Sequence, residues 1–508
     1  MQPYPATSFV NSRSTFHRLV ERLLGDEAAN LDHAALERLI DTEGREVLRS
    51  LYQDHLDLRG LRDEASSVPM AGTDGHLRTE KRRGERELGT LFGSVTVRRL
   101  ALVKRGVSGG LRPFDARLNL PVGKHSFGVQ RQIAWGAAQS SFEATVENVR
   151  RTTGATIGKR QAEELAIRLT ADFDSFYRDT LPVASEQGGD LLVLTFDGSG
   201  VVMRPESLRP ATRKKAGSPR RRSLAEQSAT HGPRRERANR KRMAEVAAVY
   251  SVKPNPRGPA DVLGDLHREG PSANRPRPTH KRVWASVQRS VFDVVEDAFL
   301  EAGLRDPETH RRWVVVVDGN QDQLRAIDCV SHNFGVEPTV VVDLIHVLGY
   351  LWKAAKALHP NNLDQVHAWV SQRTRLILQG ESSAVAAGMR RSATHRNLSL
   401  NDRKAIDACA RYFLKYRKYL RYHEYLADGL PIASGVIEGA CRSLVKDRMD
   451  ITGARWGLAG AEAVLKLRSL RASGDLDEYL EFHAEEELRR NHLEQFDGRE
   501  LVELRAAA

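Results

Sequence analysis

The stretch Leu191-Leu-Val-Leu-Thr-Phe-Asp-Gly-Ser-Gly200 decides the fold. Its first six residues are apolar or β-branched, a run typical of a strand buried on both faces of a sheet, and the run stops at Asp197-Gly. Trp313-Val-Val-Val-Val-Asp318-Gly has the same form, and Thr339-Val-Val-Val-Asp343 opens directly into a helical pattern. The sequence therefore predicts an α/β domain in which buried strands end in aspartates.

Other elements are expected around these strands. We expect 201–203 to begin a neighbouring strand, 246–252 to form a third strand, and 283–304 to be helical. A helix over 324–330 separates the strands that end at Asp318 and Asp343. The predicted order is three strands, a helix, a strand, a helix, a strand and a helix, which is the order of a ribonuclease-H-like core.

A chain of 508 residues is long enough for about three domains. We expect an N-terminal helical region, a DNA-binding region with a β-hairpin and a helix-turn-helix, a split α/β core with a basic insertion, an all-helical insertion and a C-terminal helical tail. In the same order, their boundaries are 1–65; 80–185; 186–349 with 430–475, the basic insertion being 204–245; 350–429; and 476–508.

Composition excludes several classes of protein. The three cysteines are too few and too scattered for a disulfide framework or a cysteine-rich zinc site, which fits a reducing cytosol. The N-terminus lacks the apolar segment of a signal peptide, and no run of about 18 apolar residues could span a membrane. We therefore expect a soluble, cytoplasmic protein.

The positive charge is concentrated in one segment. The chain has 78 Lys and Arg against 66 Asp and Glu, a net charge of +12, and residues 204–242 alone hold fourteen Lys or Arg against three Glu. Such a block is typical of an arm that contacts nucleic-acid phosphates, although a solubilising loop or spacer would have the same composition. The candidate contacts are Arg213, Lys214, Lys215, Arg220, Arg221 and Arg222.

A second DNA-binding candidate precedes the core. Residues 141–153 predict an amphipathic helix ended by Gly154, and we expect Thr156 to cap a second helix that presents Lys159 and Arg160 to a DNA groove. Many helical hairpins share this pattern without binding DNA. Upstream, the alternation over 88–103 predicts a β-hairpin around Gly93.

Asp197 and Asp318 are the first candidates for catalysis. Residues at the ends of such strands meet at one sheet edge, where carboxylates can hold Mg²⁺ ions for phosphoryl chemistry. Asp343 is a reserve for the second position, and His346 could lie close by. The alternatives are that an aspartate at a strand end caps the next helix and that His346 belongs to the core.

The third candidate acid is Glu438, in Pro431-Ile-Ala-Ser-Gly-Val-Ile-Glu438. Its spacing alone favours an ion pair with Arg442, four residues further along the same predicted helix. Arg448 is a candidate DNA contact, and Arg455 with Trp456 could hold a phosphate and stack a base. Trp456 could equally fill the core.

Several of these motifs resemble a known family. The sequence from Tyr422 through Glu438 to Trp456 closely resembles the C-terminal signature of bacterial insertion-sequence transposases of the ISKra type. Gly89-Thr-Leu-Phe-Gly-Ser-Val-Thr-Val-Arg-Arg resembles that family's N-terminal hairpin, and the segments at Asp197, Asp318 and Asp343 look like its three core-strand ends. The resemblance covers about 80–475 and is most specific over 422–456.

The resemblance implies a DDE transposase with a ribonuclease-H-like core. It places Asp197 at the first acidic position, Asp318 at the second with Asp343 in reserve, and Glu438 at the third, which replaces the ion-pair interpretation. It also implies two Mg²⁺ ions, with Mn²⁺ as a substitute, and a homodimer or larger assembly on double-stranded DNA at the nucleoid. The implied reaction is cleavage at the element ends followed by 3′-hydroxyl attack on target DNA.

One departure from the family lies beside the hairpin. Relatives commonly have paired cysteines there, but 100–113 contains none, so we expect no structural zinc. Two other functions remain open: a domesticated DNA-binding protein that does not cleave, and a ribonuclease-H-like nuclease without strand transfer.

Overall fold

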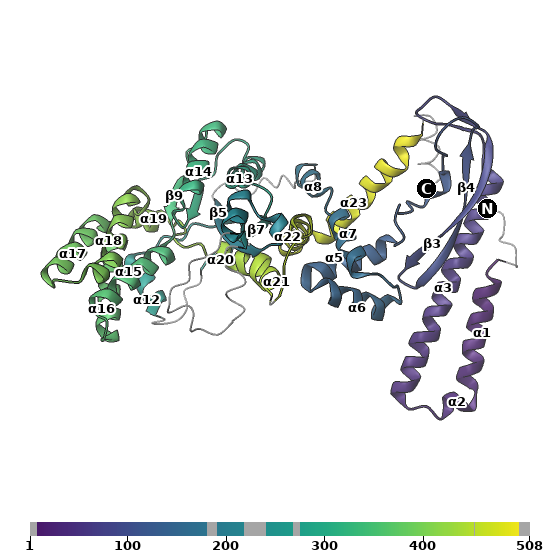
Figure 1. Ribbon diagram of the computed structural model, residues 1–508, viewed down its shortest axis with the longest axis horizontal. Coiled ribbons are helices and arrows are strands. Elements are labelled where there is room, and N and C mark those ends of the chain that lie inside the picture. Colours follow the sequence, from purple (N-terminus) through teal and green to yellow (C-terminus); the bar gives the residue numbers. More distant parts are fainter. Residues whose placement is uncertain (1–7, 180–189, 218–239, 268–274, 452, 497–508) are drawn as a thin grey trace. The chain divides into compact units, whose positions relative to one another are not determined.

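The computed structural model of the chain describes residues 8–179, 190–217, 240–267, 275–451 and 453–496 (Figure 1). The chain divides into two compact units. The first consists of 1–179 and 475–508, and the second of 180–474. The N-terminal region and the C-terminal tail therefore belong to the same unit.

The first unit begins with helices, as expected for 1–65. They are α1 (Val10–Leu24), α2 (Asp26–Ala29) and α3 (His33–Ser66). After the short pair β1 (Met70–Ala71) and β2 (Leu77–Arg78), strands β3 (Glu80–Thr90) and β4 (Gly93–Val103) pair antiparallel along their whole length. The predicted hairpin is confirmed, but β3 begins eight residues before the expected start at Leu88.

Helices α4 (Pro113–Arg117), α5 (Phe127–Gln139), α6 (Phe142–Thr153), α7 (Lys159–Arg168) and α8 (Phe173–Asp179) follow. Helix α6 ends where Gly154 adopts a φ of 69°, which a glycine tolerates without strain. Thr156 is not the cap of α7. Gly158 takes that position, and its N–H donates to the Gln161 side chain at 3.0 Å. Helices α5, α6 and α7 contact one another.

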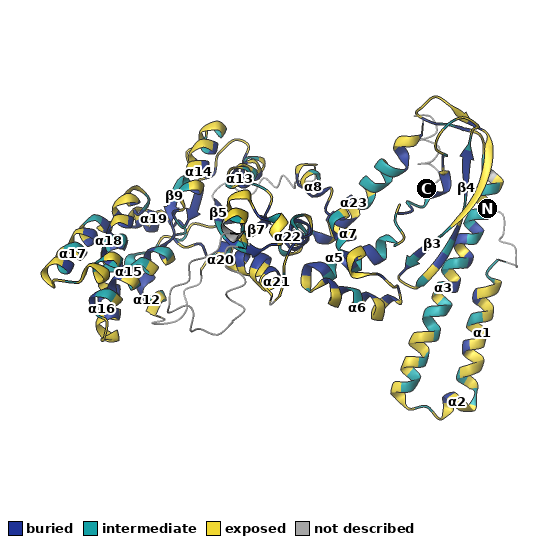
Figure 2. Cartoon of the chain, viewed as in Figure 1, coloured by how far each residue is buried: buried dark blue, intermediate teal, exposed yellow. Residues whose placement is uncertain are grey.

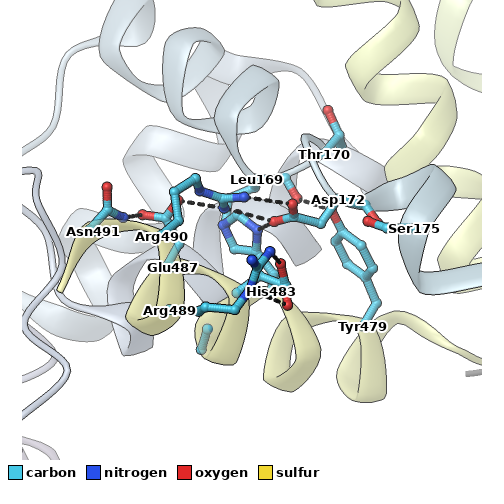
Figure 3. A network of polar contacts seen from close by, with 12 residues as sticks. Leu169, Thr170, Asp172, Ser175, Tyr479, His483, Glu487, Arg489, Arg490 and Asn491 are labelled. Atoms are coloured by element: carbon cyan, nitrogen blue, oxygen red, sulfur yellow. Dashed lines mark hydrogen bonds and ion pairs between the residues drawn. The ribbon is translucent and has the colours of Figure 1, made fainter. Parts of the chain in front are cut away.

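The C-terminal helix α23 (Leu476–Asn491) completes this unit through a buried polar network (Figure 3). The Asp172 carboxylate accepts two hydrogen bonds from Arg490, at 2.8 and 3.0 Å, and its Oδ2 lies 2.6 Å from His483 Nδ1. The Tyr479 hydroxyl donates to the carbonyl of Leu169 at 2.7 Å. Residues more than 300 positions apart in the sequence are thereby joined.

The second unit is built on a five-stranded mixed sheet, which confirms the α/β class. The strand order is β7-β6-β5-β8-β9. Strand β6 pairs antiparallel with β5 and β7, whereas β8 and β9 run parallel to β5. The strands are β5 (Leu191–Val202), β6 (Lys241–Val252), β7 (Thr279–Ser286), β8 (Trp313–Val317) and β9 (Thr339–Val342).

Two predictions of secondary structure are wrong in this sheet. Residues 201–203 begin no second strand, because β5 continues through Asp197-Gly-Ser-Gly to Val202. The glycines are not turn residues. A Cβ on Gly198 would lie 3.0 Å from Met243 Cε, and one on Gly200 would lie 2.8 Å from Lys241 Cδ, so they leave room for side chains of β6.

The expected helix over 283–304 is the second error. Residues up to Ser286 belong to β7, and helix α13 (Val291–Arg305) begins only after the Ser290 cap. The end of β7 is buried because α22 (Leu458–Ser473) packs against it. Its continuous apolar run therefore lacks the alternation that distinguishes a half-exposed strand from a helix.

From β5 to α15 the elements follow the predicted order of three strands, helix, strand, helix, strand and helix, except that α9 (Pro210–Gly217) and α12 (Pro259–His267) lie between the first three strands, and the individual strands differ from the predicted ones. Helix α14 (Gln321–Phe334) lies between β8 and β9 in the sequence, and α15 (Leu344–Leu358) follows β9. Beyond α15, the helical insertion comprises α16 (Leu363–Leu378), α17 (Ser382–His395), α18 (Leu400–Lys415), the 3-10 turn η2 (Arg417–Tyr419) and α19 (Tyr422–Ala427).

The sheet and the helical insertion share one core. Valines of β8 and β9 pack in the same buried cluster as residues of α15, α18 and α19, and buried strands contrast with the exposed outer faces of the helices (Figure 2). The chain then returns to the sheet through α20 (Gly435–Ala440), the π-helical segment η3 (Cys441–Lys446) and α21 (Asp447–Met449). In the described part of the chain, no helix is both long enough and apolar enough to cross a membrane.

Candidate active site

Asp197 and Asp318 are neighbours at one edge of the sheet. The parallel pairing of β5 with β8 ends at Thr195 and Val316, and each aspartate lies two residues beyond that pair. In-register residues of parallel strands point to the same face, and neighbouring strands are about 4.8 Å apart. The register therefore brings both aspartates to the same end of these neighbouring strands, and both are half-buried.

Each of these carboxylates is held by a local contact. Asp197 Oδ1 accepts the N–H of Gly198 at 2.7 Å, and Oδ2 lies 3.3 Å from the Cys441 thiol sulfur. Asp318 Oδ1 accepts the N–H of Asn320 at 2.6 Å. No cationic side chain among the described residues is paired with either carboxylate, so both keep lone pairs for a ligand.

Glu438 belongs to the same side of the sheet. Its helix, α20, contacts β5 and β6, and Cys441, less than one turn later, donates its thiol hydrogen to Asp197. Burial and then the Asp197 carboxylate raise the pKa of the Cys441 thiol, with a smaller contribution from Glu438. The Glu438 side chain is exposed. The contact of Cys441 with Asp197 thus joins the helical segment that carries Glu438 to β5, although the two acids are 241 positions apart in the sequence.

The ion pair of Glu438 with Arg442 is not formed. Arg442 instead faces Asp447, with 3.6 Å between Arg442 Nε and Asp447 Oδ1. The predicted pair requires α-helical spacing, but the helix widens into the π-helical segment η3 at Cys441. Such segments are rare and occur frequently at functional sites.

Asp343, the reserve for the middle position, has a different role. It is fully buried and caps α15, where Oδ1 accepts the N–H of Ile345 at 2.6 Å. Oδ2 accepts both the N–H of Ser434, at 3.2 Å, and the Ser434 hydroxyl. The carboxylate is enclosed by protein donors, which is the helix-cap alternative. His346 lies half-buried on α15, less than one turn after this cap.

Sequence reasoning missed Glu245. This residue of β6 pairs with Gly198 of β5, and its side chain is 9% exposed. Burial raises the pKa of the Glu245 carboxyl, Arg209 opposes that effect, and the negative charges of Asp197 and Asp318 raise it further. One signal was available: Glu245 is the acidic residue inside the apolar run of its strand.

The donor set suits Mg²⁺ chemically, because carboxylate oxygens are the ligands that this ion prefers. Asp197 and Asp318 fit best, since they are adjacent and have no cationic partner among the described residues. Within that described part, however, no three His, Cys, Asp or Glu side chains are grouped closely enough to hold a metal ion. A three-carboxylate site would require the exposed Glu438 side chain to turn towards the two aspartates.

The candidate DNA contacts fall into three groups. Lys159 and Arg160 are exposed at the start of α7, where Arg160 Nε lies 2.9 Å from Glu164. Arg213 and Lys214 are exposed on α9 (Pro210–Gly217), and Arg213 donates to the carbonyl of Pro205 at 3.1 Å. The side chain of Lys215 and all of Arg220, Arg221 and Arg222 lie outside the described residues.

Trp456 and Arg448 are core residues. Trp456 is 7% exposed, its indole N–H donates to the carbonyl of Met449 at 3.1 Å, and its backbone N–H donates to Val202 of β5 at 3.1 Å. The Arg448 guanidinium lies 4.8 Å from the centre of the indole ring, and burial lowers the pKa of Arg448 to about 10. Trp456 is therefore not available to stack a base, whereas Arg455 is exposed.

Comparison of the sequence with known protein families gives no match, and no curated protein matches the chain.

Proposed function

We propose that the chain is a DNA transposase with a ribonuclease-H-like catalytic core. It would hydrolyse DNA at the ends of its element and then join the freed 3′-hydroxyl to target DNA. The observation that carries this proposal is the register of Asp197 with Asp318, with Glu438 on a helix attached to Asp197 through Cys441. The order of strands and helices from β5 to α15 supports the same core.

Asp197, Asp318 and Glu438 would hold two Mg²⁺ ions, for which Mn²⁺ would substitute. When bound, such ions activate the attacking water or 3′-hydroxyl and stabilise the leaving oxygen at phosphorus. The chain supplies the rest: contacts from Gly198 and Cys441 orient the Asp197 carboxylate, and Asn320 orients that of Asp318. Buried Glu245 adds a fourth acidic group, which makes the edge attractive to divalent cations.

DNA binding would use two regions with different chemistry. Lys159 and Arg160, exposed at the first turn of α7, suit a helix that enters a DNA groove. The basic residues of 204–242 suit contacts with DNA phosphates, because binding to phosphates depends on the positive charge of the protein and not on the base sequence of the DNA. A homodimer or larger assembly, which would bring two element ends together, is part of the same proposal.

The test is cleavage of the DNA segments that flank the gene, with Mg²⁺ present. Asp197→Asn, Asp318→Asn and Glu438→Gln should each lower cleavage by about 100-fold or more, because each removes a charged ligand. Asp343→Asn, assayed well below its unfolding temperature, should retain activity. Cleavage that survives Asp318→Asn but not Asp343→Asn would contradict the site.

Strand transfer is tested separately with pre-cleaved ends and a plasmid target. A transposase gives joined products, whereas a nuclease that only hydrolyses gives none. A protein that binds the ends and cleaves nothing, with all three acids intact, would instead be the non-cleaving DNA-binding protein.

A further inference from the structure

Four tyrosines at the end of the helical insertion donate hydrogen bonds from their hydroxyls to backbone carbonyls. These carbonyls belong to β9 and to the turn that follows β8. The donors come from α18, from the residue that follows it, and from α19, in the tyrosine-rich run 412–425. The pairs are Tyr412 with Asp318 at 2.9 Å, Tyr416 with Gly319 at 2.5 Å, Tyr422 with Val342 at 2.5 Å and Tyr425 with Val340 at 3.3 Å.

Two of these pairs act on the turn that carries Asp318. Gly319 has a φ of +91°, a conformation that side chains rarely adopt, and a Cβ there would lie 3.3 Å from the Tyr412 hydroxyl and from Tyr416 Cζ. The turn is therefore enclosed by the two rings. Within the turn, the Asp318 carboxylate accepts a hydrogen bond from the N–H of Asn320.

The two tyrosines are themselves held in place. The ring of Tyr412 stacks on Tyr350 with centroids 4.1 Å apart, and it contacts the ring of Tyr416 at 4.6 Å. The Gln321 side chain donates to the Tyr416 hydroxyl at 2.8 Å. Packing fixes the rings, so the hydroxyl positions, and with them the carbonyls of Asp318 and Gly319, are defined by the insertion.

Hydrophobic packing alone does not need these hydroxyls. Phenylalanine would fill the same volume. The carbonyl of Asp318, directly after β8, would then lose the hydrogen bond that it accepts from the Tyr412 hydroxyl. What the hydroxyls add is direction, because a hydrogen bond to each of two successive carbonyls restricts rotation of the two peptide units that follow the Asp318 Cα. The orientation of these units limits where the Asp318 side chain can point.

We propose that Tyr412 and Tyr416 are positioning residues for Asp318. Their hydroxyls hold the Asp318-Gly319 backbone so that the carboxylate stays beside Asp197, and they touch neither DNA nor metal. The inference rests on the proposed function, since it assigns Asp318 to the metal site. It gives the helical insertion a specific task in the reaction.

The test measures Mn²⁺ binding to the full-length protein by calorimetry, together with the electron paramagnetic resonance spectrum of the bound ion. Tyr412→Phe and Tyr416→Phe, singly and together, are compared with Asp318→Asn. The matched control is Tyr422→Phe with Tyr425→Phe, which removes two hydroxyls that bind β9 instead. We expect the 412/416 double variant to bind Mn²⁺ about tenfold more weakly, and the control pair to change affinity less than about twofold.

Cleavage activity gives a second measurement. The 412/416 double variant should lose more activity in Mg²⁺ than in Mn²⁺, because Mg²⁺ requires stricter octahedral geometry. A purely structural role would lower activity equally with both metals. If the double variant does not fold, the two single variants decide, each with about a threefold loss of Mn²⁺ affinity expected.

The inference is overturned if the 412/416 variants bind Mn²⁺ like the wild type, or if the control pair weakens binding as much. It fails together with the proposed metal site if the wild type binds no Mn²⁺. Binding that depends on Asp318 and on the two tyrosines, without DNA cleavage, would overturn the proposed transposase and leave the positioning role standing.

Discussion

The thiol of Cys441 lies 3.3 Å from Asp197 Oδ2. This contact joins the helical segment that carries Glu438 to the central strand of the sheet. It is also an unusual choice of donor, because a thiol is a weak hydrogen-bond donor and Cys441 is buried beside negative charge.

Removing that thiol should affect activity more than folding. We expect Cys441→Ala to lower Mg²⁺-dependent cleavage by about threefold to tenfold, because Asp197 loses an orienting contact worth about 1 kcal/mol. Cys441→Ser keeps a donor and should recover most of the loss. Steady-state cleavage rates provide the measurement, with unfolding temperature as the control. Equal rates for Cys441→Ala and the wild type would show that the contact has no orienting role.

The same substitution should destabilise the fold far more at Asp343 than at Asp318. Asp343→Asn should lower the free energy of unfolding by about 2–3 kcal/mol, because the buried carboxylate caps α15 and accepts two hydrogen bonds from Ser434. Asp318→Asn, at a half-exposed position, should change it by less than about 1 kcal/mol. Urea titration of both variants measures the difference, and a reversed order would exclude the cap role of Asp343.

The polar network of α23 predicts a dependence of stability on pH. Burial raises the pKa of the Asp172 carboxyl, but hydrogen bonds from Arg490 and His483 outweigh it, so the pKa lies below the usual 3.8. A carboxyl with a lowered folded-state pKa stabilises the fold above its unfolded-state pKa and loses that contribution as pH falls through the folded-state value.

We therefore expect the wild type to lose stability below about pH 4 partly through Asp172, and Asp172→Asn to show a weaker pH dependence in that range. Urea unfolding between neutral pH and pH 3 measures the free energy of unfolding of both proteins across this range. Glu485→Gln, an exposed change on the same helix, is the control. Identical pH profiles for Asp172→Asn and the wild type would refute the assignment.

The start of α7 predicts an effect on DNA affinity. Replacing Lys159 and Arg160 together by alanine should weaken binding of the element ends by about tenfold, because both side chains are expected in a DNA groove. Arg151→Ala, an exposed change on α6 that breaks a pair with Glu147, is the matched control and should have little effect. Fluorescence anisotropy measures the affinities of the variants, and an unchanged affinity of the Lys159/Arg160 double variant would exclude DNA binding through the start of α7.

The sequence predicts the α/β class, the β-hairpin, the two helices on either side of Gly154 and the helical insertion, because each depends on local spacing. It does not predict that β5 passes through Asp197-Gly-Ser-Gly. The glycines are needed there because the side chains of Met243 and Lys241, on the paired strand β6, occupy the space beside them. Strand β7 was missed because α22, about 180 positions later, buries the face that would have shown alternation.

The same limit applies to the candidate site. Asp318 and Asp343 both follow apolar strands, and only the tertiary partners separate a half-exposed carboxylate from one enclosed by Ser434. Glu245 and Cys441 have no motif of their own. Their relation to Asp197 arises from the β5–β6 register and from the return of the chain through α20 and η3.

Helix α23 has a consequence for how the protein is made. A ribosome releases residues 476–491 only after it has synthesised all of 180–474, so Asp172 and Leu169 wait for their partners on α23 while the whole second unit emerges. The first unit to be started is thus the last to be finished. A truncated translation product that stops before Tyr479 would carry an intact sheet but an incomplete amino-terminal half, which makes it a natural substrate for cellular proteases.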